Sequence, residues 1–80
     1  MMNYPKIRNA KAIKPFTIEI LFDNNMRKIY DFNDLLADQH FSKLSEYNYF
    51  KNLKVAQGGY GIEWDDEIDI SEAELWINGK

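Results

Sequence analysis

Four acidic residues lie close together near the end of the chain, in the segment Asp65-Asp66-Glu67-Ile68-Asp69. Clustered carboxylates are the ligands that a hard cation such as calcium prefers. The segment does not match an EF-hand loop, which needs glycine at its sixth position and glutamate at its twelfth. Acidic residues also stabilise the N-terminus of a helix that follows them. We therefore favour a solvated turn before a helix over a cation site, with a buried structural Asp69 as an alternative.

Residue types that could support catalysis are sparse. His40 is the only histidine, and its neighbours Gln39 and Phe41 indicate no positioned nucleophile. The segment Gly58-Gly59-Tyr60-Gly61 lacks the Lys-Ser or Lys-Thr of a phosphate-binding loop and precedes a predicted strand, so it reads as a turn. The chain contains no cysteine, which excludes disulfides and thiolate metal sites. The sequence predicts that the protein is not an enzyme and holds no cofactor.

Aromatic residues are abundant, with five Phe, five Tyr and two Trp. Aromatic side chains on a sheet can stack nucleic-acid bases, but such platforms interleave basic residues. Here several of the candidates lie in the acidic part of the chain, and the net charge is −3. We therefore predict that the aromatic residues form the core and its rim and that the isolated domain does not bind nucleic acid. Trp64 and Trp76 are candidates for core anchors or for a protein-binding patch.

Charge is distributed unevenly along the chain. Residues 1–30 carry six basic and two acidic residues, a net charge of +4, whereas residues 61–80 carry one basic and seven acidic residues, a net charge of −6. The two ends could steer a charged partner, or they could neutralise each other in the fold. Solvated charged faces are common, so the second interpretation is favoured.

Two strands are predicted on either side of Pro15. The segment Lys6–Lys14 is weakly β-like and ends where proline cannot donate to a sheet. In Phe16–Phe22 the apolar residues recur with period two, which predicts that one face of the strand holds Phe16, Ile18, Ile20 and Phe22. An unprotected edge strand at Lys6–Lys14 would invite pairing between chains.

A hairpin turn is predicted at Asn24-Asn25, because asparagine tolerates the left-handed conformation of a two-residue type I′ loop. This loop would pair Ile20 with Ile29 and Phe22 with Arg27, and the third strand would be Met26–Asp31.

The remaining pattern alternates short helices with a second hairpin. We expect helical turns at Asn33–Ala37 and within Phe41–Asn52. Strands are expected at Leu53–Gln57 and Ile62–Trp64, with a brief extension at Ile68–Ile70. A capping box formed by Ser71 and Glu74 begins a helix from Glu72 to Ile77. The predicted fold is a single α+β domain over residues 1–80, in which short helices cover one face of an antiparallel sheet of four to five strands and a helix ends the chain.

This order of features resembles the family of domain of unknown function 2442, small prokaryotic proteins. The resemblance covers about Ile7 to Trp76 and rests on Phe16–Asn24, Arg27-Lys28, Tyr30–Leu36, Phe50–Val55, Gly61–Trp64, Asp69-Ile70 and Glu74–Trp76. Two departures concern turns: family members often have glycine at the position of Asn25, and an Asn-Gly turn where this chain has Asp66-Glu67.

The resemblance implies an α+β fold, which in some members is fused to a C-terminal helix-turn-helix that this chain is expected to lack. It also implies gene contexts typical of toxin-antitoxin-like pairs, and it supplies no catalytic residues.

We therefore expect a cytoplasmic protein-interaction or regulatory module that belongs to such a two-protein pair, with a protein partner that could be a second copy of itself. The sequence contains no stretch long and apolar enough to span a membrane. The alternative is a nucleic-acid-associated transcriptional regulator that acts through an oligomer or a partner. The residues predicted to bind the partner are Arg27, Lys28, Tyr60, Asp65, Asp66 and Glu67.

Overall fold

The computed structural model describes residues 4–65 and 67–80. Along the chain the elements are β1 (Ile7–Lys14), β2 (Thr17–Phe22), β3 (Arg27–Asp31), the 3₁₀ helices η1 (Leu35–Ala37) and η2 (Gln39–Ser45), α1 (Tyr47–Phe50), β4 (Lys54–Val55), the 3₁₀ helix η3 (Gln57–Gly59), β5 (Gly61–Glu63), β6 (Asp69–Ser71) and α2 (Glu72–Asn78). The strand pairs are antiparallel and α2 follows the last strand. The predicted α+β class is confirmed.

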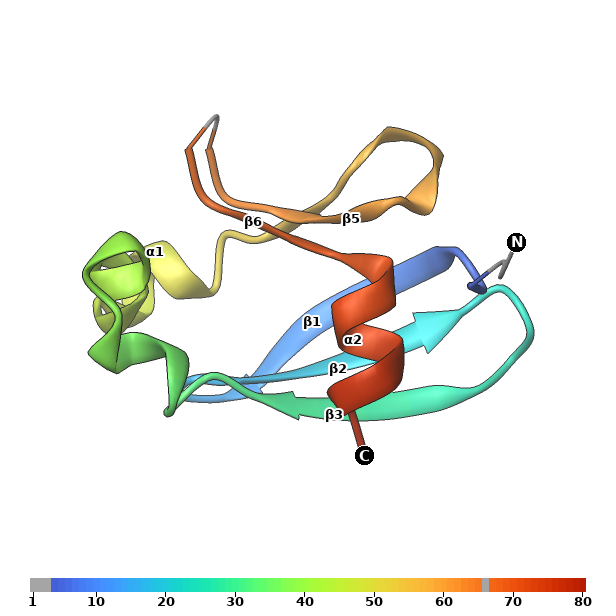
Figure 1. The fold of residues 1–80 in the computed structure, drawn as a ribbon, viewed down its shortest axis with the longest axis horizontal. Helices are drawn as coiled ribbons and strands as arrows, with labels where there is room; N and C mark the ends of the chain where they lie inside the picture. The colour runs from blue at the N-terminus through green and yellow to red at the C-terminus, as the bar shows by residue number, and fades with distance from the viewer. Residues whose placement is uncertain (1–3, 66) are drawn as a thin grey trace.

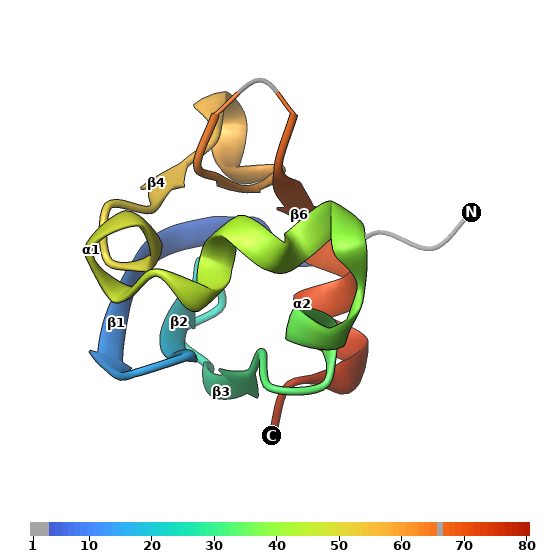
Figure 2. The same ribbon diagram turned by 90° about the vertical axis from the view of Figure 1, so that its left-hand side faces the viewer.

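The strands form two sheets instead of the predicted single sheet of four to five strands. Within the described part of the chain, β1-β2-β3 make one three-stranded sheet and β4-β5-β6 make another. The two sheets face each other, and α2 lies beside them (Figure 1). The short helices η2 and α1 close one end of this arrangement and do not lie over a sheet face (Figure 2). Each sheet has one apolar face, and stacking the two sheets buries both faces in a common core.

The core takes its apolar residues from both sheets and from the helices. Ile18, Ile20 and Phe22 on β2 are fully buried, which confirms that they share a face. Phe16 is not part of that strand: it lies in the β1–β2 turn with a φ of 65°. Pro15 followed by a residue with positive φ is typical of a type II turn. The Phe16 ring still reaches the core, where it contacts the ring of Phe50 edge to face.

An aromatic cluster joins the two sheets. Phe32 is fully buried, and its ring packs edge to face against Tyr30, Phe50 and Trp64. The buried indole N–H of Trp64 donates to the Phe50 carbonyl at 2.7 Å. Trp76 is half-buried and packs edge to face on Phe22. These aromatic residues therefore form the core and its rim, as predicted.

The β2–β3 hairpin has a register that differs by one residue from the prediction. Ile20 pairs with Lys28, and the Phe22 N–H donates to the Met26 carbonyl at 2.9 Å, so the loop has three residues, Asp23 to Asn25. Asn25 closes this loop with a φ of 70°. A three-residue loop that ends in a left-handed residue is a common hairpin connection. A one-residue shift reverses the faces of β3, so Tyr30 is buried and Ile29 is exposed.

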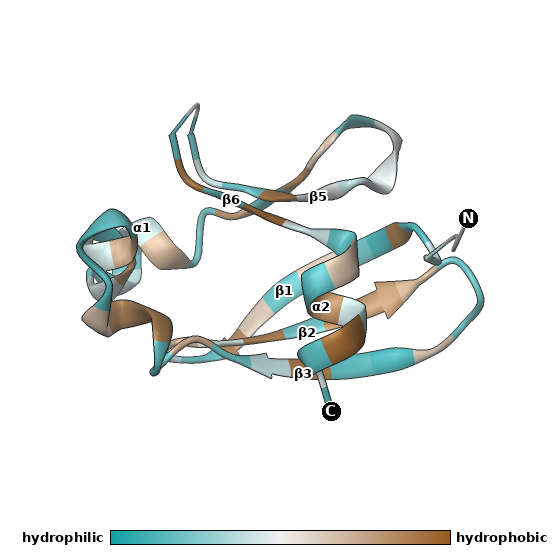
Figure 3. Cartoon of the chain, in the orientation of Figure 1, coloured by the Kyte–Doolittle hydropathy of each residue, from teal (hydrophilic) through white to brown (hydrophobic). Residues whose placement is uncertain are grey.

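The edge strands β1 and β3 carry many hydrophilic residues, which are drawn in teal in Figure 3. On the sheet face away from the core, Glu19 of β2 lies within ion-pair distance of Lys11 at 4.0 Å and Arg27 at 3.2 Å. This face is therefore charged, as expected for a face that meets solvent.

The first strand of the second sheet is shorter than predicted. Leu53–Gln57 contributes only the two residues of β4, because Gln57–Gly59 forms η3. The glycine-rich segment is a turn, as predicted, and Gly58 and Gly59 both have positive φ angles. None of the helices within the described residues is long and apolar enough to cross a membrane.

The N-terminus of α2 is capped by Ser71, whose hydroxyl accepts from the Glu74 N–H at 3.2 Å. The reciprocal half of the predicted capping box is replaced, because the Glu74 carboxylate accepts instead from the Tyr30 hydroxyl and the Asn78 amide. The Glu74 side chain therefore forms a long-range hydrogen bond with Tyr30 instead of a local bond at the start of α2.

Removal of this cap gives a first testable prediction. Ser71→Ala should lower the free energy of unfolding by about 1 kcal/mol, because a helix amide loses its acceptor. Urea denaturation followed by circular dichroism measures the change. Ser42→Ala, at an exposed serine in η2, is the control and should stay within about 0.5 kcal/mol of wild type. Equal stability of the two variants would contradict the capping role.

Candidate functional site

The residues predicted to bind a partner lie in three separate places. Arg27 and Lys28 are on β3, Tyr60 immediately precedes β5, and Asp65 and Glu67 are in the connection from β5 to β6. The sixth predicted residue, Asp66, lies outside the described residues. The structure therefore does not bring the predicted set together into one site.

Several of the predicted residues are engaged in contacts within the domain. The Lys28 ammonium lies 4.3 Å from the centre of the Trp76 ring and donates to the Trp76 carbonyl at 2.5 Å, which ties α2 to the first sheet. Lys6 lies 4.8 Å from the centre of the Tyr60 ring and forms an ion pair with Glu72 at 3.5 Å. One ion pair thus joins the basic N-terminal part of the chain to its acidic C-terminal part.

Asp65 organises the acidic turn. Its carboxylate accepts from the backbone N–H groups of Glu67 at 2.8 Å and Ile68 at 3.0 Å, and from the hydroxyl of Tyr49. These hydrogen bonds, that from Tyr49 first, hold the pKa of Asp65 below its usual value. Burial, followed by the bond to Asp65, raises the pKa of Tyr49 to about 12. Asp69 is exposed, so the alternative of a buried Asp69 is wrong.

A metal site needs several ligands that converge on one point. Among residues 4–65 and 67–80, no three His, Asp or Glu side chains come together in this way.

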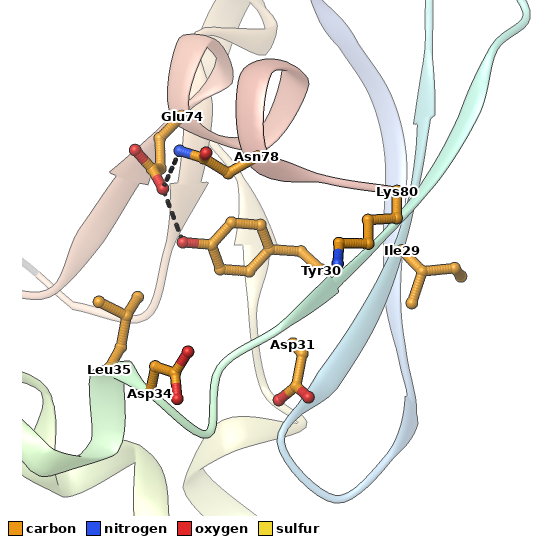
Figure 4. Close-up of a pocket in the computed structure, with 8 residues that line it drawn as sticks. All are labelled: Ile29, Tyr30, Asp31, Asp34, Leu35, Glu74, Asn78 and Lys80. Atoms are coloured by element: carbon orange, nitrogen blue, oxygen red, sulfur yellow. Dashed lines mark hydrogen bonds between the residues drawn. The ribbon is translucent and has the colours of Figure 1, made fainter.

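A groove lies where β3, η1 and α2 meet, and the sequence did not predict it. It has a volume of about 490 Å³. Figure 4 shows the residues that line it: Ile29, Tyr30, Asp31, Asp34, Leu35, Glu74, Asn78 and Lys80. These residues come from segments more than forty positions apart in the sequence.

The centre of this β3–η1–α2 groove is held by a hydrogen-bond network. The Tyr30 hydroxyl donates to the Glu74 carboxylate at 2.8 Å, and the Asn78 amide donates to the same oxygen at 2.8 Å. Burial raises the pKa of Tyr30, and the neighbouring Glu74 raises it further. The hydroxyl therefore stays protonated at neutral pH and serves to orient Glu74.

The charge of the groove is negative and largely uncompensated. Its lining contains the carboxylates of Asp31, Asp34 and Glu74 but only one cation, the Lys80 ammonium. None of the ion pairs found within the described part of the chain involves these three carboxylates. Asp31 accepts from the Asn33 backbone and side chain, which lowers its pKa.

Apolar side chains line the same hollow. Ile29 is 36% exposed and Leu35 is half-buried. The groove therefore offers both apolar surface and carboxylate oxygens to a ligand.

Comparison with known proteins places the chain in one family. A family model described as a protein of unknown function, DUF2442, matches residues 7–80, which cover the full groove. The chain belongs to the DUF2442 family. No curated protein and no solved structure matches it. The similarity read from the sequence over Ile7 to Trp76 is thereby confirmed, and it extends to Lys80.

Two signals in the sequence could have indicated part of the groove of this DUF2442 domain. Asp31 and Asp34 both lie where a predicted strand ends and a predicted helix begins, but the prediction for that region was only a helical turn at Asn33–Ala37. Glu74 fits the capping-box pattern, so the sequence predicted a local backbone bond for its side chain and not the bond to Tyr30. The predicted register also placed Ile29 in the core, so it was not a candidate for an exposed site.

The raised pKa of Tyr30 predicts a dependence of stability on alkaline pH. Its neutral hydroxyl contributes stability fully below pH 10, the ordinary pKa of tyrosine. Above that pH the unfolded chain releases the phenolic proton while the folded DUF2442 domain keeps it, so stability falls as the pH rises.

Tyr30→Phe should remove this contribution. The free energy of unfolding of wild type should therefore decline more steeply above pH 10 than that of the variant, as measured by urea denaturation at several pH values. Tyr49 is present in both proteins, so its titration cancels in the comparison. If the free energies of unfolding of the two proteins fell in parallel above pH 10, the role given to Tyr30 would be contradicted.

Proposed function

We propose that this DUF2442 domain is a protein-interaction module and not an enzyme, and that its partner binds at the β3–η1–α2 groove. The observation that carries the proposal is an open, partly apolar groove with three carboxylates and a single cation. An amphipathic hollow with a few fixed polar groups is typical of a binding site. We further propose a regulatory role, as one half of a toxin-antitoxin-like pair in the cytoplasm.

The two edges of the first sheet are poorly suited to pair with a strand of a partner protein. β1 has register irregularities at both ends of its pairing with β2, and it carries Arg8, Lys11 and Lys14. Bulges and lysines are common protections of an edge strand. On the other edge, Ile29 exchanges two backbone hydrogen bonds with Lys80, at 3.2 and 2.8 Å. These features favour recognition by side chains in the groove over pairing of strands between chains.

A capture experiment in the source organism tests the proposed function. The tagged wild-type domain should recover a stoichiometric protein partner, and the complex should form again from the two purified proteins. A groove variant that combines Asp31→Asn, Asp34→Asn and Glu74→Gln should recover much less of that partner, because it keeps the shape and hydrogen bonds of the groove but removes its charge. Failure to recover any stoichiometric partner, including a second copy, would overturn the proposal.

A second candidate function is supported by the basic residues of the first sheet. Arg8, Lys11, Lys14 and Arg27 are exposed on β1 and β3. Cations on one sheet can contact phosphates, and such binding weakens steeply with salt. A transcriptional regulator that uses this surface within an oligomer or a complex should bind duplex DNA at about 50 mM salt and lose it at about 200 mM salt. Fluorescence anisotropy of labelled duplex DNA, with the domain alone and with its partner, measures this salt-dependent binding.

A further inference from the structure

We propose that the β3–η1–α2 groove binds an arginine side chain presented by a basic segment of the partner protein. This inference rests on the proposed function and names the chemistry of the partner. The guanidinium would lie among the groove carboxylates, and its aliphatic stem would lie along Leu35. Arginine combines an apolar stem with a charged head, so it matches both kinds of surface in the groove.

The charge of the groove selects a cationic occupant. Three carboxylates against one ammonium give the lining a net charge of −2. None of the ion pairs in the described residues uses these carboxylates, and Lys80 is the one cation among the residues that line the groove. An acidic or neutral side chain would gain no binding energy from the negative potential of the groove.

The spacing of the carboxylates favours arginine over a compact cation. In Figure 4 the Tyr30 ring lies across the groove, with Glu74 on one side and Asp31 and Asp34 on the other. The carboxylates do not converge as a metal site requires within the described residues. A planar guanidinium has five N–H donors that diverge and can reach acceptors on different sides, whereas an ammonium is a point charge.

The hydrogen bonds at Glu74 leave it able to receive a ligand. Tyr30 and Asn78 both donate to one of its oxygens, Oε2, and both donors are neutral. These bonds hold the carboxylate in place without cancelling its charge. A carboxylate that is fixed before the ligand arrives loses less side-chain freedom on binding.

Titration of the intact domain with short peptides tests this inference. The probe is acetyl-Gly-Gly-Arg-Gly-Gly-amide, and the matched peptides replace arginine with lysine or with citrulline, which has the same shape and no charge. Backbone amide NMR spectra should show shifts centred on Tyr30, Asp31, Leu35 and Glu74. We expect the citrulline peptide to bind at least about tenfold more weakly than the arginine peptide, and the lysine peptide to fall between them.

Three substitutions identify the groove as the site. Asp34→Asn and Glu74→Gln should each weaken binding of the arginine peptide by about threefold to tenfold, because each removes one partner of a charge-assisted bond. Lys80→Gln should strengthen binding by about twofold, because it removes a competing cation. Glu46→Gln makes the same change of net charge at an exposed residue outside the groove and should leave binding unchanged.

Equal binding of the arginine and citrulline peptides would overturn the inference, as would shifts confined to β1 or no shifts at millimolar peptide. An undisturbed amide spectrum of each variant shows that its fold is intact.

The two proposals fail separately. A stoichiometric partner that binds the Asp34→Asn and Glu74→Gln variants as well as wild type overturns the inference and leaves the interaction function standing. Absence of any partner overturns the function, whatever the peptides do.

Discussion

Phe32→Ala should lower the free energy of unfolding by about 3–5 kcal/mol, the largest effect that we expect from a single substitution in this domain. Phe32 is fully buried at the point where the two sheets and the short helices meet. Its ring centre lies 4.8 Å from that of Tyr30, 5.4 Å from that of Phe50 and 5.5 Å from that of Trp64. Alanine would leave a cavity that these large rings cannot fill without moving.

The size of this loss matters because the domain is small. With 80 residues, its total stability is expected to be roughly 4–12 kcal/mol. The variant should therefore be partly unfolded in buffer or unfold at a much lower urea concentration. Tryptophan fluorescence reports the transition directly, since Trp64 belongs to the cluster. Tyr60→Ala, at a side chain that is 61% exposed, is the control and should cost less than about 1 kcal/mol.

A loss below about 1 kcal/mol for Phe32→Ala would mean that the aromatic cluster does not hold the sheets together. The result also bears on the groove, because Phe32 is flanked by Asp31, and its neighbour Tyr30 carries the hydroxyl that holds Glu74. A destabilised cluster should therefore weaken peptide binding as well, although Phe32 does not itself line the groove.

Gly59→Ala should lower the free energy of unfolding by about 2–4 kcal/mol, through two separate costs. The φ of Gly59 is +76°, a conformation that costs an L-residue with a side chain about 1–2 kcal/mol. An added Cβ would also lie 2.6 Å from the Ile7 carbonyl oxygen and 2.9 Å from the Ile7 nitrogen. Both atoms belong to the backbone of β1, so the 3₁₀ helix η3 would have to move away from the first sheet.

Gly58 provides a matched control for this second prediction. Its φ is +80°, so Gly58→Ala carries the same conformational cost. The added Cβ would meet only the exposed ring of Tyr60, which can rotate away. The difference between the two variants in urea denaturation therefore measures the contact between η3 and β1. Equal losses would show that this contact is loose.

Local sequence signals predicted the parts of the fold that depend on neighbouring residues. The period-two pattern of β2, the end of β1 at Pro15 and the Ser71 cap of α2 are all present. Each of these signals acts within a few residues, through backbone hydrogen bonds or the alternation of side chains along a strand. The glycine-rich turn belongs to the same group, because positive φ angles favour glycine whatever the rest of the fold is.

Features that depend on distant residues could not be predicted in this way. Loops of two and of three residues are both common in hairpins, and burial of Tyr30 against Phe32 distinguishes the register that is observed. The choice between one sheet and two depends on whether the apolar faces pack side by side or face to face, which no local pattern encodes.

The sequence by itself thus determined the α+β class, the main strands, the capped helix and membership of the DUF2442 family. Only the tertiary structure decided where a partner could bind. It separated the residues predicted to form a partner site, and it brought Asp31 and Asp34 into one groove with Glu74, which lies on α2. The physical reason is that the groove exists only when α2 packs against β3, a contact fixed by the long-range bonds of Tyr30 and Lys28.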